Sequence, residues 1–423
     1  MRRGVLALAI ALGGQLPSAG AAPAGAAPAG VERYVVVLER DVARPASIAA
    51  EHARKYRLDV GMVYNSAIKG YAATIPAARV GAVRADDRVA YLTPDVEVNA
   101  AKRRATTQVV PSGVNRINAE FKQNTGSGAE VAVLDTGIDI DHPDLIDNIR
   151  GGKNCSTGPS FDDGNGHGTH VAGTIAAARN RSGVVGVAPD AGLWAVRVLN
   201  NAGSGSISSV VCGIDFVDSK SPAKGGSITV ANMSLSGSGS DDGQCGSVNN
   251  DAMHEAICRT VDDGVTFAVA AGNEDENLAA SIPAAYDEVI TVSALADSTG
   301  TPCGTGGPTT YGADDTFASF SNFAGSSDAS HTIAAPGVSI RSTDKNGTYS
   351  FKSGTSMAAP HIAGTAALYL AANPGTTPAG VAAALQALGE PKDVSFQDEC
   401  GTGASHTDPS GLHPEVVVRA DTL

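Results

Sequence analysis

One serine in this 423-residue chain stands in a setting that favours nucleophilic chemistry. Ser356 lies within Gly-Thr-Ser-Met-Ala-Ala-Pro-His (354–361), and the alanine-rich run 362–372 that follows is predicted to be helical. A helix N-terminus presents unpaired N–H groups and a partial positive charge. A serine hydroxyl there can attack a carbonyl carbon while its own N–H stabilises the resulting oxyanion. A turn that caps an ordinary core helix has a similar sequence, so the chemistry requires a base and an acid elsewhere.

Two upstream motifs supply such an acid and such a base. The apolar run 130–135 ends in Asp135, which is typical of a buried parallel strand that delivers a carboxylate at its C-terminal end. In open α/β sheets, ligands bind outside that end of the strands. The glycine-rich segment 163–170 then opens into a second predicted helix and presents His167 between two glycines.

These three motifs resemble those of the subtilisin-like serine peptidases, whose acid, histidine and serine follow one another in this order. The resemblance implies that Ser356 is the nucleophile, His167 the base that later protonates the leaving amine, and Asp135 the acid that holds the imidazole. Ala270-Ala-Gly-Asn273 matches the segment that carries the family's side-chain oxyanion donor, which assigns that role to Asn273. The implied protein is a secreted serine endopeptidase that acts through an acyl-enzyme and requires no cofactor for catalysis.

Short backbone segments are predicted to bind the protein or peptide substrate, because an extended peptide is most simply held as an added strand. By resemblance, the residues that line this peptide are Gly203, Ser204, Gly205, Ser234, Leu235, Ser236, Gly237, Ala270, Ala271 and Gly272. Many relatives carry glycine at the position of Ser236, so this side chain is expected to narrow or polarise the pocket rim. Neither wall segment contains an acidic residue, which predicts a preference for apolar or aromatic side chains over basic ones.

Several residues allow more than one interpretation. His170 lies three residues after His167, but no acid or cysteine with zinc-like spacing is nearby, which favours a structural histidine. His361 is expected to pack in the core or behind the site. A catalytically inactive binding module is the alternative from a different class, and the complete catalytic set argues against it. A cysteine protease lacks a matching motif, and an esterase does not need paired peptide-binding segments.

The N-terminal quarter of the chain divides into further segments. Two arginines followed by an apolar run have the layout of a secretory signal peptide, which predicts removal of residues 1–21, an Ala/Gly/Pro linker over 22–31, secretion and no membrane span. Residues 32–104 show a βαββαβ pattern, which predicts a ferredoxin-like module. This module resembles the family's inhibitory propeptide. The resemblance implies an autoprocessed zymogen whose propeptide acts as intramolecular inhibitor and chaperone, with its tail (94–101) in the active site and cleavage between Asn99 and Ala105.

Residues 105–423 are predicted to form the catalytic domain, with a less regular tail over 388–423. Predicted strands and helices alternate along it: strands at 131–135, 192–199, 227–234, 265–271 and 288–292, and helices at 168–178, 206–219, 247–262 and 356–372. This alternation predicts an α/β fold, a three-layer α/β/α domain of the subtilisin-like type with a mostly parallel sheet covered on both faces.

Charge and cysteine content limit the partners. The net charge is +4 over 32–104 and −20 over 105–423, which favours docking of the two parts. The catalytic part lacks a basic patch, so we expect no nucleic acid partner, and we expect a monomer. Six cysteines in a secreted chain predict disulfides, and 15 pairings remain open. Acid-rich loops are candidates for structural calcium, although none has the EF-hand spacing and the site stays unknown: 139–147, 241–242, 262–263 and 314–315.

Overall fold

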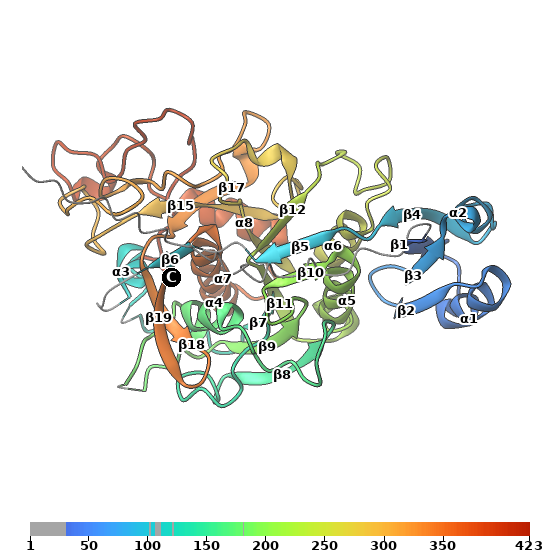
Figure 1. Ribbon diagram of the computed structural model, residues 1–423. Helices are drawn as coiled ribbons and strands as arrows, with labels where there is room; N and C mark the ends of the chain where they lie inside the picture. Colours follow the sequence, from blue (N-terminus) through green and yellow to red (C-terminus); the bar gives the residue numbers. More distant parts are fainter. Residues whose placement is uncertain (1–30, 101–102, 106–110, 121, 181) are drawn as a thin grey trace, which may run out of the picture.

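The structure, a computed structural model, describes residues 31–100, 103–105, 111–120, 122–180 and 182–423, which form two packed units (Figure 1). The predicted signal peptide and almost all of the predicted linker lie outside these residues. The smaller N-terminal unit is blue and stands at the right of Figure 1. Within the described chain, no helix combines the length and apolar character needed to cross a bilayer.

The N-terminal unit has the predicted βαββαβ order. Its elements are β1 (Val31–Leu38), α1 (Pro45–Tyr56), β2 (Asp59–Tyr64), β3 (Gly70–Pro76), α2 (Ala77–Arg84) and β4 (Val89–Pro94). The strands pair antiparallel in the order β2-β3-β1-β4. β1 is apolar at consecutive positions because both of its faces are buried. Val36 packs on the unit's own helices, whereas Val35 and Val37 pack against the larger unit.

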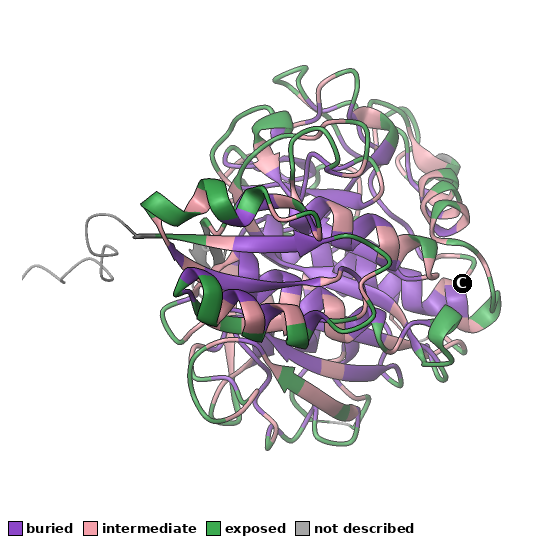
Figure 2. Cartoon of the chain, turned by 90° about the vertical axis from the view of Figure 1, so that its right-hand side faces the viewer, coloured by how far each residue is buried: buried purple, intermediate pink, exposed green. Residues whose placement is uncertain are grey.

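The larger unit is built on a central sheet with the order β16-β15-β13-β11-β7-β9-β8, and β17 also pairs with β15. These strands are β7 (Glu130–Asp135), β8 (Ile149–Asn154), β9 (Gly192–Arg197), β11 (Ile228–Met233), β13 (Thr266–Ala270), β15 (Ile290–Ala296), β16 (Thr316–Phe317) and β17 (Thr332–Pro336). Every pairing is parallel except that of β15 with β16. Apart from the edge strand β8, these strands are largely buried, which explains their continuous apolar runs. In Figure 2 the N-terminal unit faces the viewer, and its strands are largely buried whereas its helices are exposed on their outer faces.

Helices cover both faces of this sheet, which confirms the three-layer prediction. One face carries α4 (His167–Ala176), α7 (Thr355–Ala372) and α8 (Pro378–Leu388), and the other carries α5 (Ile207–Asp218) and α6 (Ala252–Asp262). α6 begins five residues later than predicted because the Asp251 side chain caps it, accepting from the N–H groups of Met253 and His254. Short helical segments complete the chain: Ser112–Arg116 (α3), Pro222–Lys224, Leu278–Ala280, Ala329–His331 and Phe396–Asp398.

The two units meet through hydrogen bonds on α5 and α6. Asp215 of α5 accepts from the backbone N–H groups of residues 65–67. Asp95 in turn accepts from the N–H and hydroxyl of Ser208 at 2.7 and 2.6 Å, in the first turn of α5, where an acidic group is favoured. These short-range contacts do not test the predicted docking of the two units by opposite net charge. That attraction acts at longer range and stays a prediction.

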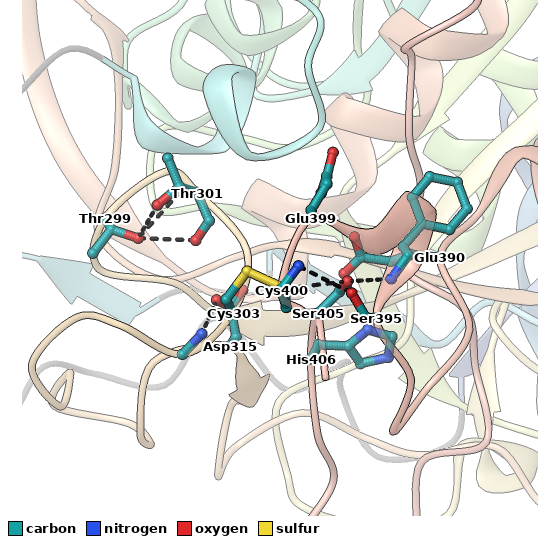
Figure 3. Close-up of a disulfide and its surroundings, with 12 residues drawn as sticks. Thr299, Thr301, Cys303, Asp315, Glu390, Ser395, Glu399, Cys400, Ser405 and His406 are labelled. Carbon is teal, nitrogen blue, oxygen red and sulfur yellow. Dashed lines mark hydrogen bonds and ion pairs between the residues drawn. A yellow bond between two sulfur atoms is a disulfide. The ribbon is translucent and has the colours of Figure 1, made fainter. Parts of the chain in front are cut away.

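The six cysteines form three disulfides, Cys155–Cys212, Cys245–Cys258 and Cys303–Cys400. The last one joins the irregular tail to the loop after β15 (Figure 3). Beneath it, Arg116 is fully buried and pairs with Asp315 and Glu390, and the same glutamate pairs with Arg419 at 2.9 Å. The tail therefore belongs to the packed domain although it contains little regular structure.

Candidate active site

Ser356 lies at a strand-to-helix junction. β19 (Thr348–Ser353), which forms a hairpin with β18 (Ile340–Asp344), leads through Gly354 into α7. The serine is fully buried, and its Oγ donates to the backbone oxygen of Ser234 at 3.2 Å. The hydroxyl of Ser234 donates back to the Ser356 carbonyl at 2.9 Å, so the first turn of α7 is fixed against the end of β11.

Asp135 and His167 meet at the C-terminal edge of the sheet, as predicted. Asp135 ends β7 and His167 begins α4, which packs against α7. The imidazole Nδ1 lies 2.8 and 2.9 Å from the two carboxylate oxygens, and both side chains are buried. An ionised carboxylate can only accept, so Nδ1 carries a proton and Nε2 is left as the basic nitrogen.

Asp163 holds the start of α4, a role that sequence reasoning did not assign. One carboxylate oxygen accepts from the N–H groups of Asn165 and Gly166 and from the Thr136 hydroxyl. The other accepts from the N–H and hydroxyl of Thr169. A carboxylate at this N-terminus also interacts favourably with the helix dipole. The loop that carries His167 is therefore fixed to the residue that follows Asp135.

Asn273 faces the residue before Ser356. Its Oδ1 accepts from the N–H of Thr355 at 2.8 Å, which leaves the Nδ2 amide hydrogens available to another acceptor. The Thr355 hydroxyl also contacts the backbone of Gly272, whose φ is +109°. A side chain at Gly272 would collide with Asn322, so this wall of the site requires glycine.

The predicted substrate-binding segments form two strands with a third strand between them. β10 (Ser204–Ser206) and β12 (Leu235–Ser238) both pair antiparallel with β5 (Glu97–Ala100), and β12 also pairs with β14 (Ser281–Ile282). Figure 1 shows β5 reaching from the N-terminal unit into this gap. Farther along, β6 (Arg103–Ala105) pairs with β19, where Arg103 lies opposite Ser353. The chain therefore approaches the Ser356 turn from both sides.

The predicted wall residues contribute in different ways. Leu235 lies in the hydrophobic core, so only its backbone faces β5. Ser236 is partly exposed and lies opposite Asn99 in the strand register. Ala270 and Ala271 are fully buried. Gly205 could not carry a side chain, because a Cβ would come within 2.6 Å of the Val198 oxygen.

The motif-bearing region is similar to a known protein family. The sequence model of the subtilase family matches residues 126–403. The chain belongs to the subtilase family. It is 41% identical over 300 residues to an alkaline protease of Alkalihalobacillus alcalophilus, which covers 70% of this chain and 67% of that protein. It is 39% identical over 323 residues to subtilisin E of Bacillus subtilis (strain 168), which covers 74% of each.

A solved structure agrees with this assignment. The crystal structure of a cold adapted subtilisin-like serine proteinase matches with a TM-score of 0.54 and 32% identity, over 73% of this chain and 99% of that one. With this fold and these relatives, the subtilase described here is a serine endopeptidase.

In this subtilase, a partly buried lysine links the two halves of the site, which the sequence did not suggest. Lys352 on β19 donates from Nζ to the backbone oxygen of Gly166, next to His167, at 2.6 Å. The same Nζ lies 3.1 Å from Asp344 on β18. Burial lowers the pKa of Lys352, while Asp344 opposes that effect. The lysine therefore holds the N-terminus of α4 against the hairpin that leads to Ser356.

The other two motif histidines are buried among backbone atoms. His170 Nε2 lies 3.0 Å from the Ile340 oxygen, and burial lowers its pKa. His361 Nδ1 lies 2.9 Å from the Met357 oxygen, and burial lowers its pKa to about 4. Both arrangements are consistent with the structural role favoured by the sequence.

Two of the predicted calcium loops bring acidic side chains together with other possible ligands. Within the described residues, Asp297 joins Asp314 and Asp315 in one group, and Asp241 and Asp242 join His254 in another. The loops 139–147 and 262–263 form no such group there. In the first group, Asp315 already pairs with Arg116, and burial raises the pKa of Asp297 to about 7. That group therefore fits calcium poorly.

Proposed function

We propose that this subtilase is a secreted endopeptidase, made as a zymogen, that hydrolyses peptide bonds through Ser356, His167 and Asp135. His167 Nε2 takes the proton of the Ser356 hydroxyl as Oγ attacks the scissile carbonyl carbon. The same proton then passes to the leaving amine, the C–N bond breaks and an acyl-enzyme remains. Water then attacks the acyl-enzyme. His167 takes a proton from the water and returns it to Ser356 Oγ, which releases the acid product and restores the serine.

Two donors stabilise the negative charge that develops on the carbonyl oxygen. They are the Nδ2 amide of Asn273 and the backbone N–H of Ser356. The contact between Asn273 Oδ1 and the Thr355 N–H supports this role, because it orients the amide before substrate binds. Donors that are already in place need no reorganisation during the reaction, which is the source of their catalytic effect.

The observation that carries the zymogen proposal is the path of the chain itself. β5 lies between β10 and β12 as an added strand, and β6 continues along β19 beside the serine turn. This is how an extended peptide would bind across the site. We propose that residues 32–104 act as an inhibitory propeptide and folding aid, and that the enzyme cuts its own chain between Ala100 and Arg103.

Replacement of the nucleophile tests this proposal. The S356A variant should accumulate as an uncut proform, whereas the parent protein should yield a new N-terminus that follows residue 100, 101 or 102, as mass spectrometry can show. Active enzyme added to the S356A proform should produce the same N-terminus. Normal maturation of S356A in a protease-deficient host would assign the cut to another protease.

The pocket walls support a preference for apolar or aromatic residues before the scissile bond. Ala270 and Ala271 offer no charge, and Ser236 places only a hydroxyl at the rim. A panel of fluorogenic peptides that differ at this position tests the preference. A strict requirement for Arg or Lys would contradict it.

Three further predictions complete the proposal. The three disulfides suit an oxidising, extracellular setting and support secretion. A monomer is expected. Structural calcium remains a prediction, and melting with and without a calcium chelator tests it, because a bound ion must stabilise the folded state.

A further inference from the structure

A loop next to α6 brings two carboxylates and one histidine together, outside the residues assigned to catalysis. Asp241 and Asp242 lie in the loop between β12 and α6, and His254 lies in the first turn of α6. One potential ligand atom from each residue lies within 4.8 Å of the others.

His254 is oriented so that one ring nitrogen faces the two carboxylates. Its side chain is 1% exposed, and the ring stacks on Tyr286 with centroids 4.0 Å apart. Nε2 lies 2.8 Å from Glu288, which fixes the proton on that nitrogen. Nδ1 is buried, faces Asp241 and Asp242, and has no hydrogen-bond partner among the described residues.

The distances from Nδ1 to the two carboxylate oxygens are too long for hydrogen bonds. They match the spacing expected between two ligands of one metal ion. Nδ1 lies 3.5 Å from Asp241 Oδ1 and 3.7 Å from Asp242 Oδ1. A hydrogen bond requires about 2.7–3.2 Å between these atoms. Two ligands on a tetrahedral zinc ion, each about 2.1 Å from the metal, are separated by roughly 3.4 Å. The histidine also has the carboxylate partner on its second nitrogen that metal-bound histidines usually have.

The surrounding loop already fixes the ligand atoms. Asp242 accepts from the backbone N–H groups of four residues, namely Gln244, Gly246, Val248 and Asn249. The disulfide Cys245–Cys258 closes the same loop onto α6, so its sulfur atoms are not free to bind metal. Asp241 is 18% exposed, which provides a path for an ion from solvent.

We propose that Asp241, Asp242 and His254 bind a divalent transition-metal ion of the zinc type, with water completing the coordination. An imidazole nitrogen is a ligand for zinc and related ions, whereas calcium takes six to eight oxygen ligands. The ion ties the loop after β12 to the start of α6, so its role is structural. The sequence also offered the loop 241–242 for calcium, and the imidazole of His254 is the ligand that favours a zinc-type ion there.

Metal titration of the purified, active-site-blocked protein tests this proposal. After stripping with EDTA, and without reductant, the melting temperature should rise with added Zn²⁺. This rise should be lost in H254Q, whereas any rise caused by Ca²⁺ should persist in that variant. Titration calorimetry should give one site whose affinity falls at least about 10-fold in H254Q and in D241N, and about 10- to 100-fold in E288Q, which removes only the second-sphere partner.

His331 offers a matched control. It is also buried, with Nδ1 3.4 Å from one carboxylate, that of Asp287, but it belongs to no group of three candidate ligands in the described chain. H331Q should therefore keep the zinc effect. Zinc that binds at His167 would still raise the melting temperature of H254Q. A zinc-dependent rise that is unchanged in H254Q would therefore overturn the proposal. Absence of any zinc response would overturn it too.

Discussion

Replacing Arg116 with methionine should destabilise this subtilase strongly, because it leaves buried carboxylates without their cation. Arg116 Nε lies 2.6 Å from Asp315, and its two terminal nitrogens contact both oxygens of Glu390. All three side chains are 0–2% exposed. Removal of one partner of a buried ion pair typically costs about 3–5 kcal/mol.

The pKa of Glu390 supports that magnitude. Burial raises this pKa, but hydrogen bonds from His406 and Arg116 more than offset the effect and hold it at about 2, below the ordinary 4.5. A difference of this size corresponds to roughly 3 kcal/mol of stability at neutral pH, shared among its partners. Because the folded-state pKa is lowered, this contribution is present above about pH 4.5 and is lost as the pH falls toward 2.

Scanning calorimetry of R116M in the S356A background measures the loss without self-digestion. For a domain of this size about 2 °C corresponds to 1 kcal/mol, so the melting temperature at pH 7 should fall by about 6–10 °C. The difference in melting temperature between R116M and the parent should shrink near pH 4, because the uncompensated carboxylates of the variant can then take up protons. R150M, at an exposed arginine, is the control and should shift melting by less than about 1 °C. A pH-independent shift below 2 °C in R116M would refute the reasoning.

Three further predictions concern catalysis and are measured with a fluorogenic peptide. D135N should lower kcat by about 10⁴-fold, the loss known for the corresponding change in a serine protease of another fold, and unchanged activity would exclude Asp135 as the orienting acid. N273A should lower kcat by about 100- to 1000-fold with little change in KM, a range established in this family, and a pure KM effect would contradict the oxyanion role. K352M should lower kcat by about 10-fold, because α4 loses the charged hydrogen bond at Gly166, and parent-like kinetics would limit Lys352 to a structural role.

Local sequence signals predicted the elements that carry Asp135, His167 and Ser356, because each signal lies within one element. Asp135 ends a continuous apolar run, His167 directly follows Gly166, and Ser356 lies two residues after Gly354, both at the start of apolar helices. Such patterns do not depend on distant partners. The predicted start of α6 is too early because the cap at Asp251, and not the helical pattern before it, decides where the helix begins.

Features that depend on distant contacts were not predicted. The pairing of Cys303 with Cys400 spans 97 residues, and nothing local selects it from the 15 possibilities. Glu390 pairs with Arg116, which lies 274 residues earlier in the sequence. The segment around Glu390 has no hydrophobic periodicity, so the sequence does not indicate that this side chain is buried. The sequence around Lys352 predicts an exposed strand residue. Its contact with the Gly166 carbonyl depends on the fold, because Gly166 lies far away in the sequence.

In the binding mode proposed above, the slot between β10 and β12 also limits which proteins the enzyme can digest. It is one strand wide, and a peptide as long as the segment from Glu97 to Ala105 would span roughly 30 Å when fully extended. A helix is too thick for such a slot, and a strand inside a sheet has already committed its hydrogen bonds. A folded protein must therefore release a loop of this length before it can be cut. Cleavage then reports how readily a target unfolds locally, and well-folded copies of the enzyme itself are poor targets.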